Sequence, residues 1–315
     1  MNNGHPGKLR LFIQAAFFAL TNSYIEGFAG GKIYKGPLKK LCVPGLNCYS
    51  CPGARFSCPI GSLQAVLDSG QYRMSLYVLG MMSVFGILLG RVVCGFLCPF
   101  GLVQDLLYRI PVFRKKQAPG KWAKRKNLLG HRLLLKLKYL VLLFFVIVLP
   151  MTVTSFAGMG DPWFCKYICP SGTLAAGLPL LLTNESLRGA AGILFGWKAL
   201  VLFAIILLSV AFYRPFCKYL CPLGAFYGFF NRAAFYRLEV NEEKCIRCGK
   251  CQAVCGMDIR TFETPNSMEC IRCGACLSAC PTDAISSSLS ELMKGIGKKT
   301  AGGDTVCTKS SDLRS

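Results

Sequence analysis

The stretch that decides the fold of the C-terminal part reads Cys245-Ile-Arg-Cys248-Gly-Lys-Cys251-Gln-Ala-Val-Cys255, and it returns as Cys270-Ile-Arg-Cys273-Gly-Ala-Cys276-Leu-Ser-Ala-Cys280-Pro281. Both runs have the spacing C-x2-C-x2-C-x3-C. A structural zinc site usually shows two separated C-x2-C pairs, so duplicated runs of four cysteines argue against zinc. The spacing indicates iron–sulfur cubes, with three neighbouring thiolates around one cube and the fourth cysteine directed to another.

This spacing is typical of bacterial two-cluster ferredoxins. It predicts one [4Fe–4S] cluster held by Cys245, Cys248, Cys251 and Cys280, and a second held by Cys270, Cys273, Cys276 and Cys255. One departure is Gly256, which follows Cys255 where many ferredoxins have proline. The change affects the local turn and removes no ligand.

The sequence before these runs has the composition of a membrane protein. Hydrophobic residues make up 53% of the 315-residue chain and come in blocks. A helix needs about 20 apolar residues to span a bilayer, and four segments have that length: 9–29, 74–93, 133–154 and 190–213. We therefore predict a mainly α membrane domain over 1–237 and a small α+β ferredoxin domain over 238–287. A disordered tail over 288–315 would hold Cys307 as a spare thiol.

Charge indicates how the chain is oriented. The net charge is +22, but the basic residues lie next to apolar spans, which favours the positive-inside rule over nucleic-acid binding. The second loop, 109–132, is dense in Lys and Arg, whereas the third holds only Lys166 and Arg188. We expect a multi-pass protein of a prokaryotic cell membrane with both termini cytoplasmic. The first loop carries basic residues as well, which weakens this contrast.

A second cysteine signature recurs through the membrane part. Four cysteines are each followed by Pro-x-Gly and an apolar stretch: Cys58, Cys98, Cys169 and Cys221. Proline suits the first position of a helix, so each cysteine is expected at a helix start. Each half of the chain then reads as span, cysteine motif, span, cysteine motif, which predicts two parallel pseudo-repeats about an axis along the membrane normal.

The repeats predict where these cysteines meet. Cys94, Cys98, Cys217 and Cys221 follow spans of the same direction and would form an inner, cytoplasmic-side [4Fe–4S] site. On the outer side, Cys165 and Cys169 face the first loop, and by analogy we favour a fourth site of Cys51, Cys58, Cys165 and Cys169. A rival grouping uses Cys42, Cys48, Cys51 and Cys58 alone, and a disulfide among the remaining cysteines stays open.

These motifs carry a family resemblance. The ferredoxin runs, together with Cys94-Gly-Phe-Leu-Cys98-Pro and Cys217-Lys-Tyr-Leu-Cys221-Pro, resemble the polyferredoxin-type membrane proteins that include NapH, the membrane part of NosR and the CcoG proteins. The resemblance covers about residues 75 to 285. It implies four or more membrane helices, several [4Fe–4S] clusters and electron transfer linked to quinol or a partner reductase. The cysteine-rich first loop and the missing flavin domain depart from that pattern.

The function expected is a redox relay between the ferredoxin clusters and a quinone or a redox partner at or across the membrane. Partners would be membrane lipid and a ferredoxin, a flavodoxin or another oxidoreductase, and a partner could carry flavin. Without a Ser-His-Asp set, phosphate loop or dinucleotide fingerprint, any oxidoreductase role would be that of an electron-transfer component. Glu26 and Asp105 are intramembrane acid candidates, more simply interpreted as interfacial. The alternative is an accessory metal-handling or sensing protein, suggested by Met74, Met81, Met82 and Met159.

Overall fold

The computed structural model describes residues 6–67, 72–110, 129–153, 161–189 and 192–288. Within them the protein is mainly helical, as predicted, and the strands belong to the C-terminal part. The predicted tail with Cys307, the basic segment 111–128 and Met159 lie outside the described residues.

The first half contains α1 (Pro6–Thr21), α2 (Ile25–Gly30), the 3₁₀ turn η1 (Pro37–Lys40), α3 (Pro59–Leu67), α4 (Tyr72–Leu89), α5 (Val92–Phe96) and α6 (Pro99–Tyr108). The second half begins with one continuous helical stretch made of α8 (Leu129–Val141), the π-helix η3 (Leu142–Val148) and α9 (Leu149–Thr152). It continues with η4 (Phe164–Ile168), α10 (Pro170–Gly172), η5 (Thr173–Gly177), α11 (Leu178–Thr183), α12 (Glu185–Gly189), α13 (Ile193–Ala211), α14 (Pro215–Tyr219) and α15 (Pro222–Phe230).

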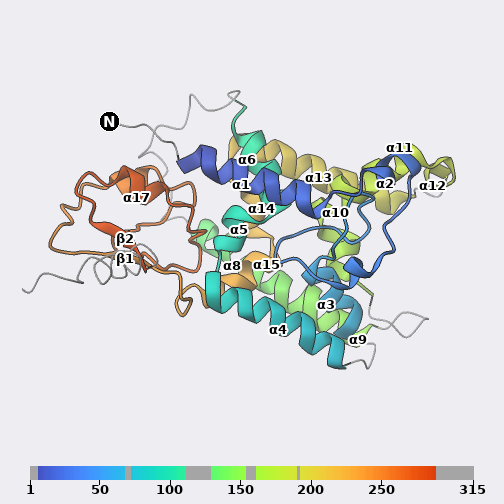
Figure 1. Ribbon diagram of the computed structural model, residues 1–315, viewed down its shortest axis with the longest axis horizontal. Helices are drawn as coiled ribbons and strands as arrows, with labels where there is room; N and C mark the ends of the chain where they lie inside the picture. Colours follow the sequence, from blue (N-terminus) through green and yellow to red (C-terminus); the bar gives the residue numbers. More distant parts are fainter. Residues whose placement is uncertain (1–5, 68–71, 111–128, 154–160, 190–191, 289–315) are drawn as a thin grey trace, which may run out of the picture.

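The C-terminal domain is closed by two short strands. Strand β1 (Leu238–Val240) pairs antiparallel with β2 (Ile285–Ser287), with Leu238 opposite Ser287. Between the strands lie the two cysteine runs and the short helices α16 (Lys250–Ala253) and α17 (Ala275–Ala279). This domain sits at one end of the long axis of the molecule (Figure 1).

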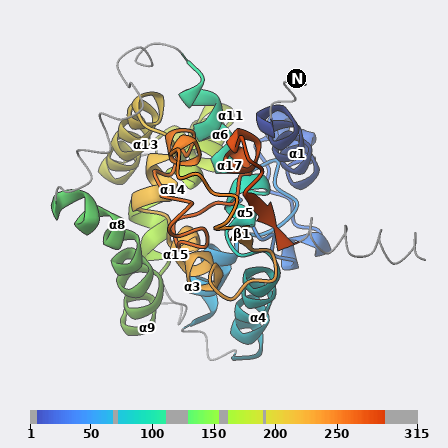
Figure 2. The same ribbon diagram turned by 90° about the vertical axis from the view of Figure 1, so that its left-hand side faces the viewer.

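The two halves of the helical part pack as copies of one another. Helix α1 contacts α5 and α6, and in the same way α8 contacts α14 and α15. The halves also exchange partners, because α13 packs on α6 while α4 packs on α15. Seen from the ferredoxin end, α1, α4, α8–α9 and α13 stand at four corners around the cysteine-bearing helices (Figure 2). The contacts follow the repeat found in the sequence.

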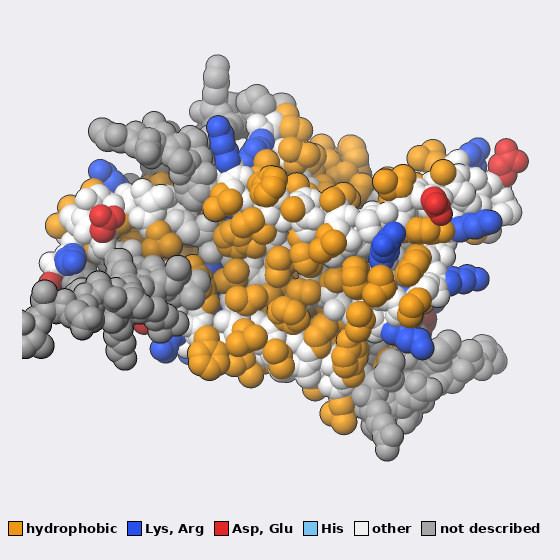
Figure 3. All heavy atoms as spheres, in the orientation of Figure 1, with side chains coloured by type: hydrophobic (Ala, Val, Ile, Leu, Met, Phe, Trp, Pro, Cys, Tyr) orange, Lys and Arg blue, Asp and Glu red, His pale blue; other side chains and the backbone are white. Residues whose placement is uncertain are grey.

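The corner helices expose apolar side chains. Phe12 on α1 is 71% exposed, Leu76 on α4 66% and Phe203 on α13 60%. Figure 3 shows a broad band of hydrophobic side chains on the visible face, with charged residues gathered toward the two ends of the long axis. A soluble monomer rarely exposes an apolar patch of this extent.

Two helical stretches, Leu133–Thr152 and Ile193–Ala211, are long and apolar enough to cross a bilayer, and the apolar stretch Leu76–Leu89 is shorter. The segment expected as the first span differs most from a single straight helix. It is divided into α1 and α2, and the break falls at the polar residues 22–24. Four spanning helices therefore stay a prediction.

A buried ion network ties α1, α6 and the end of α13 together. Asp105 accepts hydrogen bonds from Arg214 (Nε to Oδ1, 2.7 Å) and Arg10 (Nη2 to Oδ2, 2.8 Å). Arg214 has a left-handed backbone, with φ 47°, and no exposed side-chain surface. The carboxylate compensates a charge that would be costly to bury alone. Asp105, considered above as an interfacial acid, is thus a structural ion-pair partner of the interior.

A second network mirrors the first and joins the ferredoxin domain to the helices. Glu269 accepts hydrogen bonds from Lys138 of α8 (2.5 Å to Oε1) and from Arg91 (3.2 Å). Lys138 and Arg91 correspond in the repeat to Arg10 and Arg214. The position corresponding to Asp105 is Gly228, seven residues after Cys221. A Cβ on Gly228 would lie 3.0 Å from the Met268 carbonyl oxygen, so the ferredoxin domain supplies the carboxylate that the second half lacks.

Replacing Glu269 by Gln tests this docking. Two fully buried cations lose their carboxylate, so the free energy of local opening of residues 266–272 is expected to fall by about 3–5 kcal/mol. Hydrogen exchange of the purified full-length protein measures it. The matched control is Glu263→Gln, which breaks the exposed pair with Arg260 and should change stability by less than about 1 kcal/mol. Equal protection in both variants contradicts the docking role.

Candidate iron–sulfur sites

The first ferredoxin set lies farthest from the helical part and faces solvent. Its four predicted ligands Cys245, Cys248, Cys251 and Cys280 all line one pocket of about 330 Å³, together with Phe262 and Ile285. Cys248 is exposed and Cys251 is buried. We call this group the distal set. Its pocket gives four thiols a common space, which is what one cube requires.

The second set, Cys255, Cys270, Cys273 and Cys276, also converges, and we call it the proximal set. Burial, followed by the neighbouring thiols of Cys270, Cys273 and Cys255, raises the pKa of Cys276 to about 12. Iron binds the thiolate, so a bound metal must displace these protons. The convergence of the thiols fits the sharing of the fourth cysteine between the two runs.

The two runs share one backbone conformation. Left-handed φ values recur at equivalent positions, at Arg247 and Arg272 (49° and 52°) and at Asp258 and Asp283 (59° and 48°). Gly256 therefore leaves the turn after Cys255 intact. A Cβ at position 256 would lie 2.5 Å from the Tyr213 ring. The absence of proline there is explained by Tyr213, which packs against this turn.

The proximal set is held against the helical part through backbone contacts. A Cβ on Gly95 of α5 would lie only 2.6 Å from the carbonyl oxygen of Ile271. Asn231 donates from Nδ2 to the carbonyl oxygen of Cys270 at 2.7 Å and accepts the Arg91 N–H at 2.9 Å. Gly95 follows Cys94 in the chain, and Ile271 follows Cys270. Because Gly95 and Ile271 are in contact, the proximal set and the inner cysteines are neighbours.

The Cys-Pro-x-Gly signature is a helix cap. The backbone N–H of Gly224 donates to the sulfur of Cys221 at 3.4 Å, and Cys221 is the N-cap of α15. Cys98 and Cys169 are likewise the N-caps of α6 and α10, without a side-chain cap hydrogen bond, and α3 begins at Pro59 directly after Cys58. A side chain that accepts an N–H in the first turn fixes the start of a helix. At Cys221 the hydrogen bond also orients the sulfur and stabilises its thiolate.

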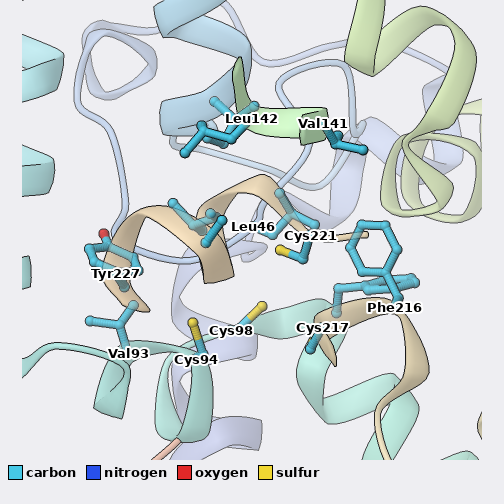
Figure 4. Packing of buried hydrophobic residues seen from close by; sticks show 14 of the residues in the cluster. Leu46, Val93, Cys94, Cys98, Val141, Leu142, Phe216, Cys217, Cys221 and Tyr227 are labelled. Carbon is cyan, nitrogen blue, oxygen red and sulfur yellow. The ribbon is translucent and has the colours of Figure 1, made fainter. Parts of the chain in front are cut away.

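The inner set, Cys94, Cys98, Cys217 and Cys221, is brought together from both halves. Burial, and then the neighbouring thiols of Cys217, Cys94 and Cys98, raise the pKa of Cys221. All four cysteines are buried. Figure 4 shows them within one cluster of buried side chains, with Phe216 and Tyr227 beside them.

Two arginines hydrogen-bond the backbone of the inner set, each one binding the half of the repeat to which it does not belong. Arg214 donates to the carbonyl oxygen of Cys94 at 2.5 Å, and Arg91 donates to that of Cys217 at 3.2 Å. Each arginine stands three residues before the cysteine of its own half and binds the other half. Gln104 adds a hydrogen bond from Nε2 to the sulfur of Cys217 at 3.1 Å. Cations and donors of this kind stabilise an anionic cluster and tune its potential.

The outer cysteines are arranged differently from the favoured grouping. Cys58, Cys165 and Cys169 are mutual neighbours, and the sulfur beside them is that of Cys48. Cys51 instead directs its sulfur to Oδ1 of Asn22 at 3.7 Å. Cys42 hydrogen-bonds the hydroxyl of Ser62 at 3.5 Å. No disulfide links the cysteines of the described residues.

The remaining candidate metal donors have other surroundings. In the part of the chain that the structure describes, no three Cys, His, Asp or Glu residues lie close enough to hold a single metal ion. Thiolates around a [4Fe–4S] cube bind separate iron atoms and stand farther apart than ligands of one ion. Met82 is fully buried in the apolar core and Met81 packs against it, which is a packing role. Glu26 lies in the first turn of α2.

Sequence reasoning missed the residues that surround the thiols. Arg91, Arg214, Gln104 and Glu269 were not singled out. The signal for three of them is in the repeat itself, because Arg-x-x-Cys-x-x-x-Cys-Pro occurs in both halves and Cys-Pro-x-Gly-x-x-Gln occurs twice in the first half. Glu269 carries no local pattern, since its partners lie more than a hundred residues away.

The chain matches two family profiles, both described as 4Fe-4S binding domains. One matches residues 71–119, 139–182 and 194–238, so that each match spans a helix and the cysteine element after it. The other matches 238–261 and 264–286, the two ferredoxin runs. The uncharacterized protein MJ0750 of Methanocaldococcus jannaschii is 33% identical over 210 residues, which are 65% of this chain and 75% of that protein. The chain belongs to the NapH/MauN-like family of ferredoxin-type proteins.

Named members of the family include the methylamine utilization ferredoxin-type protein MauN of Paracoccus denitrificans, 28% identical over 53% of this chain and 48% of its own length. The ferredoxin-type protein NapH of Haemophilus influenzae is 28% identical over 54% of this chain and 49% of its own. The chain thus spans about half the length of MauN and NapH. No solved structure matches the chain. As a NapH/MauN-like protein it carries 4Fe–4S binding domains, in agreement with the cysteine spacing.

Replacing Gln104 by Leu removes the hydrogen bond to the sulfur of Cys217. A donor to a ligand sulfur stabilises the more negative, reduced state, so its loss should lower the reduction potential of the inner site. A redox titration followed by electron paramagnetic resonance (EPR) measures the shift. Iron content should not change. Gln252→Leu on the ferredoxin domain is the control, and a Gln104→Leu variant with an unshifted potential contradicts the role.

Proposed function

We propose that this protein is a membrane-bound electron carrier in which electrons pass along a line of thiolate-held sites, from the distal set through the proximal set to the inner set. The observation that carries the proposal is the close docking of the proximal set on the inner set. A [4Fe–4S] cluster supplies a one-electron carrier when bound. The chain's part is to hold each set at a fixed separation and to neutralise its charge.

The order of the sites follows from burial and contact. The distal set includes the exposed Cys248, so it is the set that a soluble donor or acceptor can approach. The proximal set lies between it and the helices, held by Asn231 and by the Glu269 network. The inner set is enclosed by both halves of the repeat. Electron tunnelling falls off steeply with distance, so this order favours stepwise transfer along the line.

The membrane placement is supported by the corner helices. Their apolar side chains are exposed on α1, α4 and α13, and two helical stretches have the length and composition of spans. Charged residues gather at the ends of the long axis (Figure 3). The Lys- and Arg-rich loop 109–132 follows α6, which ends on the ferredoxin side (Figure 1). By the positive-inside rule the ferredoxin domain faces the cytoplasm.

The exchange partners follow from this placement. A soluble ferredoxin or flavodoxin is the partner proposed for the distal set, and a quinone or a membrane-associated redox protein is the partner proposed at the bilayer. Neither direction of electron flow is fixed by the chain, because potentials are set by hydrogen bonds, charge and exposure together.

The relay is tested with a double variant, Cys94→Ser and Cys217→Ser, in anaerobically purified full-length protein. Iron should fall by about four per chain, because one cube has four irons, while the two ferredoxin signals in EPR persist. In vesicles, reduction of a quinone by a reduced ferredoxin should then fall at least about tenfold. Cys42→Ser is the control and should keep both iron and transfer. Unchanged iron in the double variant would mean that no shared inner site exists.

A further inference from the structure

We propose that the chain holds a fourth [4Fe–4S] site, ligated by Cys48, Cys58, Cys165 and Cys169, at the end of the membrane part opposite the ferredoxin domain. This inference rests on the relay proposed above and extends it beyond the inner set. It is carried by a second copy of the inner-site geometry, with Cys48 in a ligand position that sequence analogy had given to Cys51.

The first support is a repeated glutamine. Gln64 of α3 stands six residues after Cys58, as Gln104 of α6 stands six after Cys98. Gln64 donates to the sulfur of Cys165 at 3.6 Å and accepts the N–H of Phe164 at 3.1 Å. Gln104 makes the same pair of contacts with Cys217 and with the N–H of Phe216. The outer thiols thus sit in the framework that surrounds the inner thiols.

The second support comes from two glycines that face sulfur atoms across the repeat. A Cβ built on Gly61 would lie 3.7 Å from the sulfur of Cys165, and one built on Gly172 would lie 3.7 Å from that of Cys48. Gly61 belongs to the Cys58 element and Gly172 to the Cys169 element. The sulfur of Cys48 thus lies next to the glycine of the Cys169 element, just as the sulfur of Cys165 lies next to the glycine of the Cys58 element. This equivalence identifies Cys48 as the fourth ligand.

The donor set fits a soft metal centre. Cys58 and Cys169 are buried, and Cys48 and Cys165 are partly buried. Sulfur donors suit iron–thiolate ligation better than they suit a hard metal ion.

The outer set lies close to the inner set along the chain itself. A Cβ built on Gly45 would lie 3.1 Å from the Cα of Cys98, and Leu46 lies in the same buried cluster as Cys98. Cys48 of the outer set follows two residues after Leu46, so the Cα atoms of Leu46 and Cys48 are at most about 7 Å apart. Tyr227 anchors this segment by donating to the carbonyl oxygen of Pro44 at 3.0 Å. Each electron exchange between the sets would oxidise one by one electron and reduce the other by one, and no bond would form or break.

The consequence is that the line of sites extends from the exposed ferredoxin end toward the opposite end of the long axis. The outer set lies near α10 and α3, which Figure 1 places beyond α5 and α14 as seen from the ferredoxin domain. Electrons could then be exchanged with a partner on the opposite face of the membrane.

The test is iron and sulfide analysis of the anaerobically purified full-length protein with EPR of the reduced sample. The unaltered chain should hold about 16 irons, at four per cube. The double variant Cys48→Ser and Cys169→Ser should hold about 12 and lose one signal. The matched control Cys51→Ser lies in the same loop and should keep all of its iron. Persistence of the ferredoxin signals shows that the variant is folded.

Several outcomes overturn the inference. Iron lost from Cys51→Ser but not from the Cys48 variant refutes the ligand set, and zinc in place of iron refutes the cluster. If about 12 irons are found in the unaltered chain and about 8 in the Cys94/Cys217 variant, the relay stands and the outer site does not. Should the outer double variant fail to fold, Gln64→Leu serves instead. It should lower the potential of a signal that the Cys94/Cys217 variant retains, and an unshifted potential overturns the site.

Discussion

The structure depends on one constraint, the need to hold anionic sulfur ligands inside an apolar protein. Transfer of charge out of water is costly unless donors and counter-charges replace the solvent. The chain meets this need in a repeated way. Each Cys-Pro-x-Gly element places its cysteine directly before a helix, and at Cys221 the backbone N–H of Gly224 donates to the sulfur at 3.4 Å. A glutamine and an arginine then reach the site from other elements. The cysteine-bearing helices are short because their role is to start at a thiol.

In the two-fold repeat, the side chains that surround the thiols also join the two halves of the helical part. Arg91 and Arg214 each bind a carbonyl oxygen of the opposite half, and α13 and α4 pack on the opposite α6 and α15. Neither half can complete an inner site alone. The symmetry of the ion networks is broken where Asp105 in one half has Gly228 as its counterpart. Glu269 of the ferredoxin domain supplies the missing carboxylate, and its neighbour Cys270 thereby lies next to the inner set.

Much of this could be predicted from sequence, because ligand spacing is a local property. The distal and proximal sets follow from C-x2-C-x2-C-x3-C, and the helix starts at Cys58, Cys98, Cys169 and Cys221 follow from the proline after each. The position of Cys48 could not be predicted, because Cys48 stands ten positions before Cys58, whereas its counterpart Cys165 stands four positions before Cys169. The Asp105 and Glu269 networks join residues about 95 to 178 positions apart, and no periodicity reports such contacts. The break between α1 and α2 at residues 22–24 was visible only as a few polar residues.

The glycine at position 228 has a bearing on how such proteins evolve. With no side chain there, Arg91 and Lys138 depend on an acid from another domain, so the helical bundle and the ferredoxin unit cannot be exchanged as independent modules. A family member that ends before residue 238 would inherit two buried cations without a counter-ion. Its history should record a compensating acid at the position of Gly228, or the loss of both basic residues.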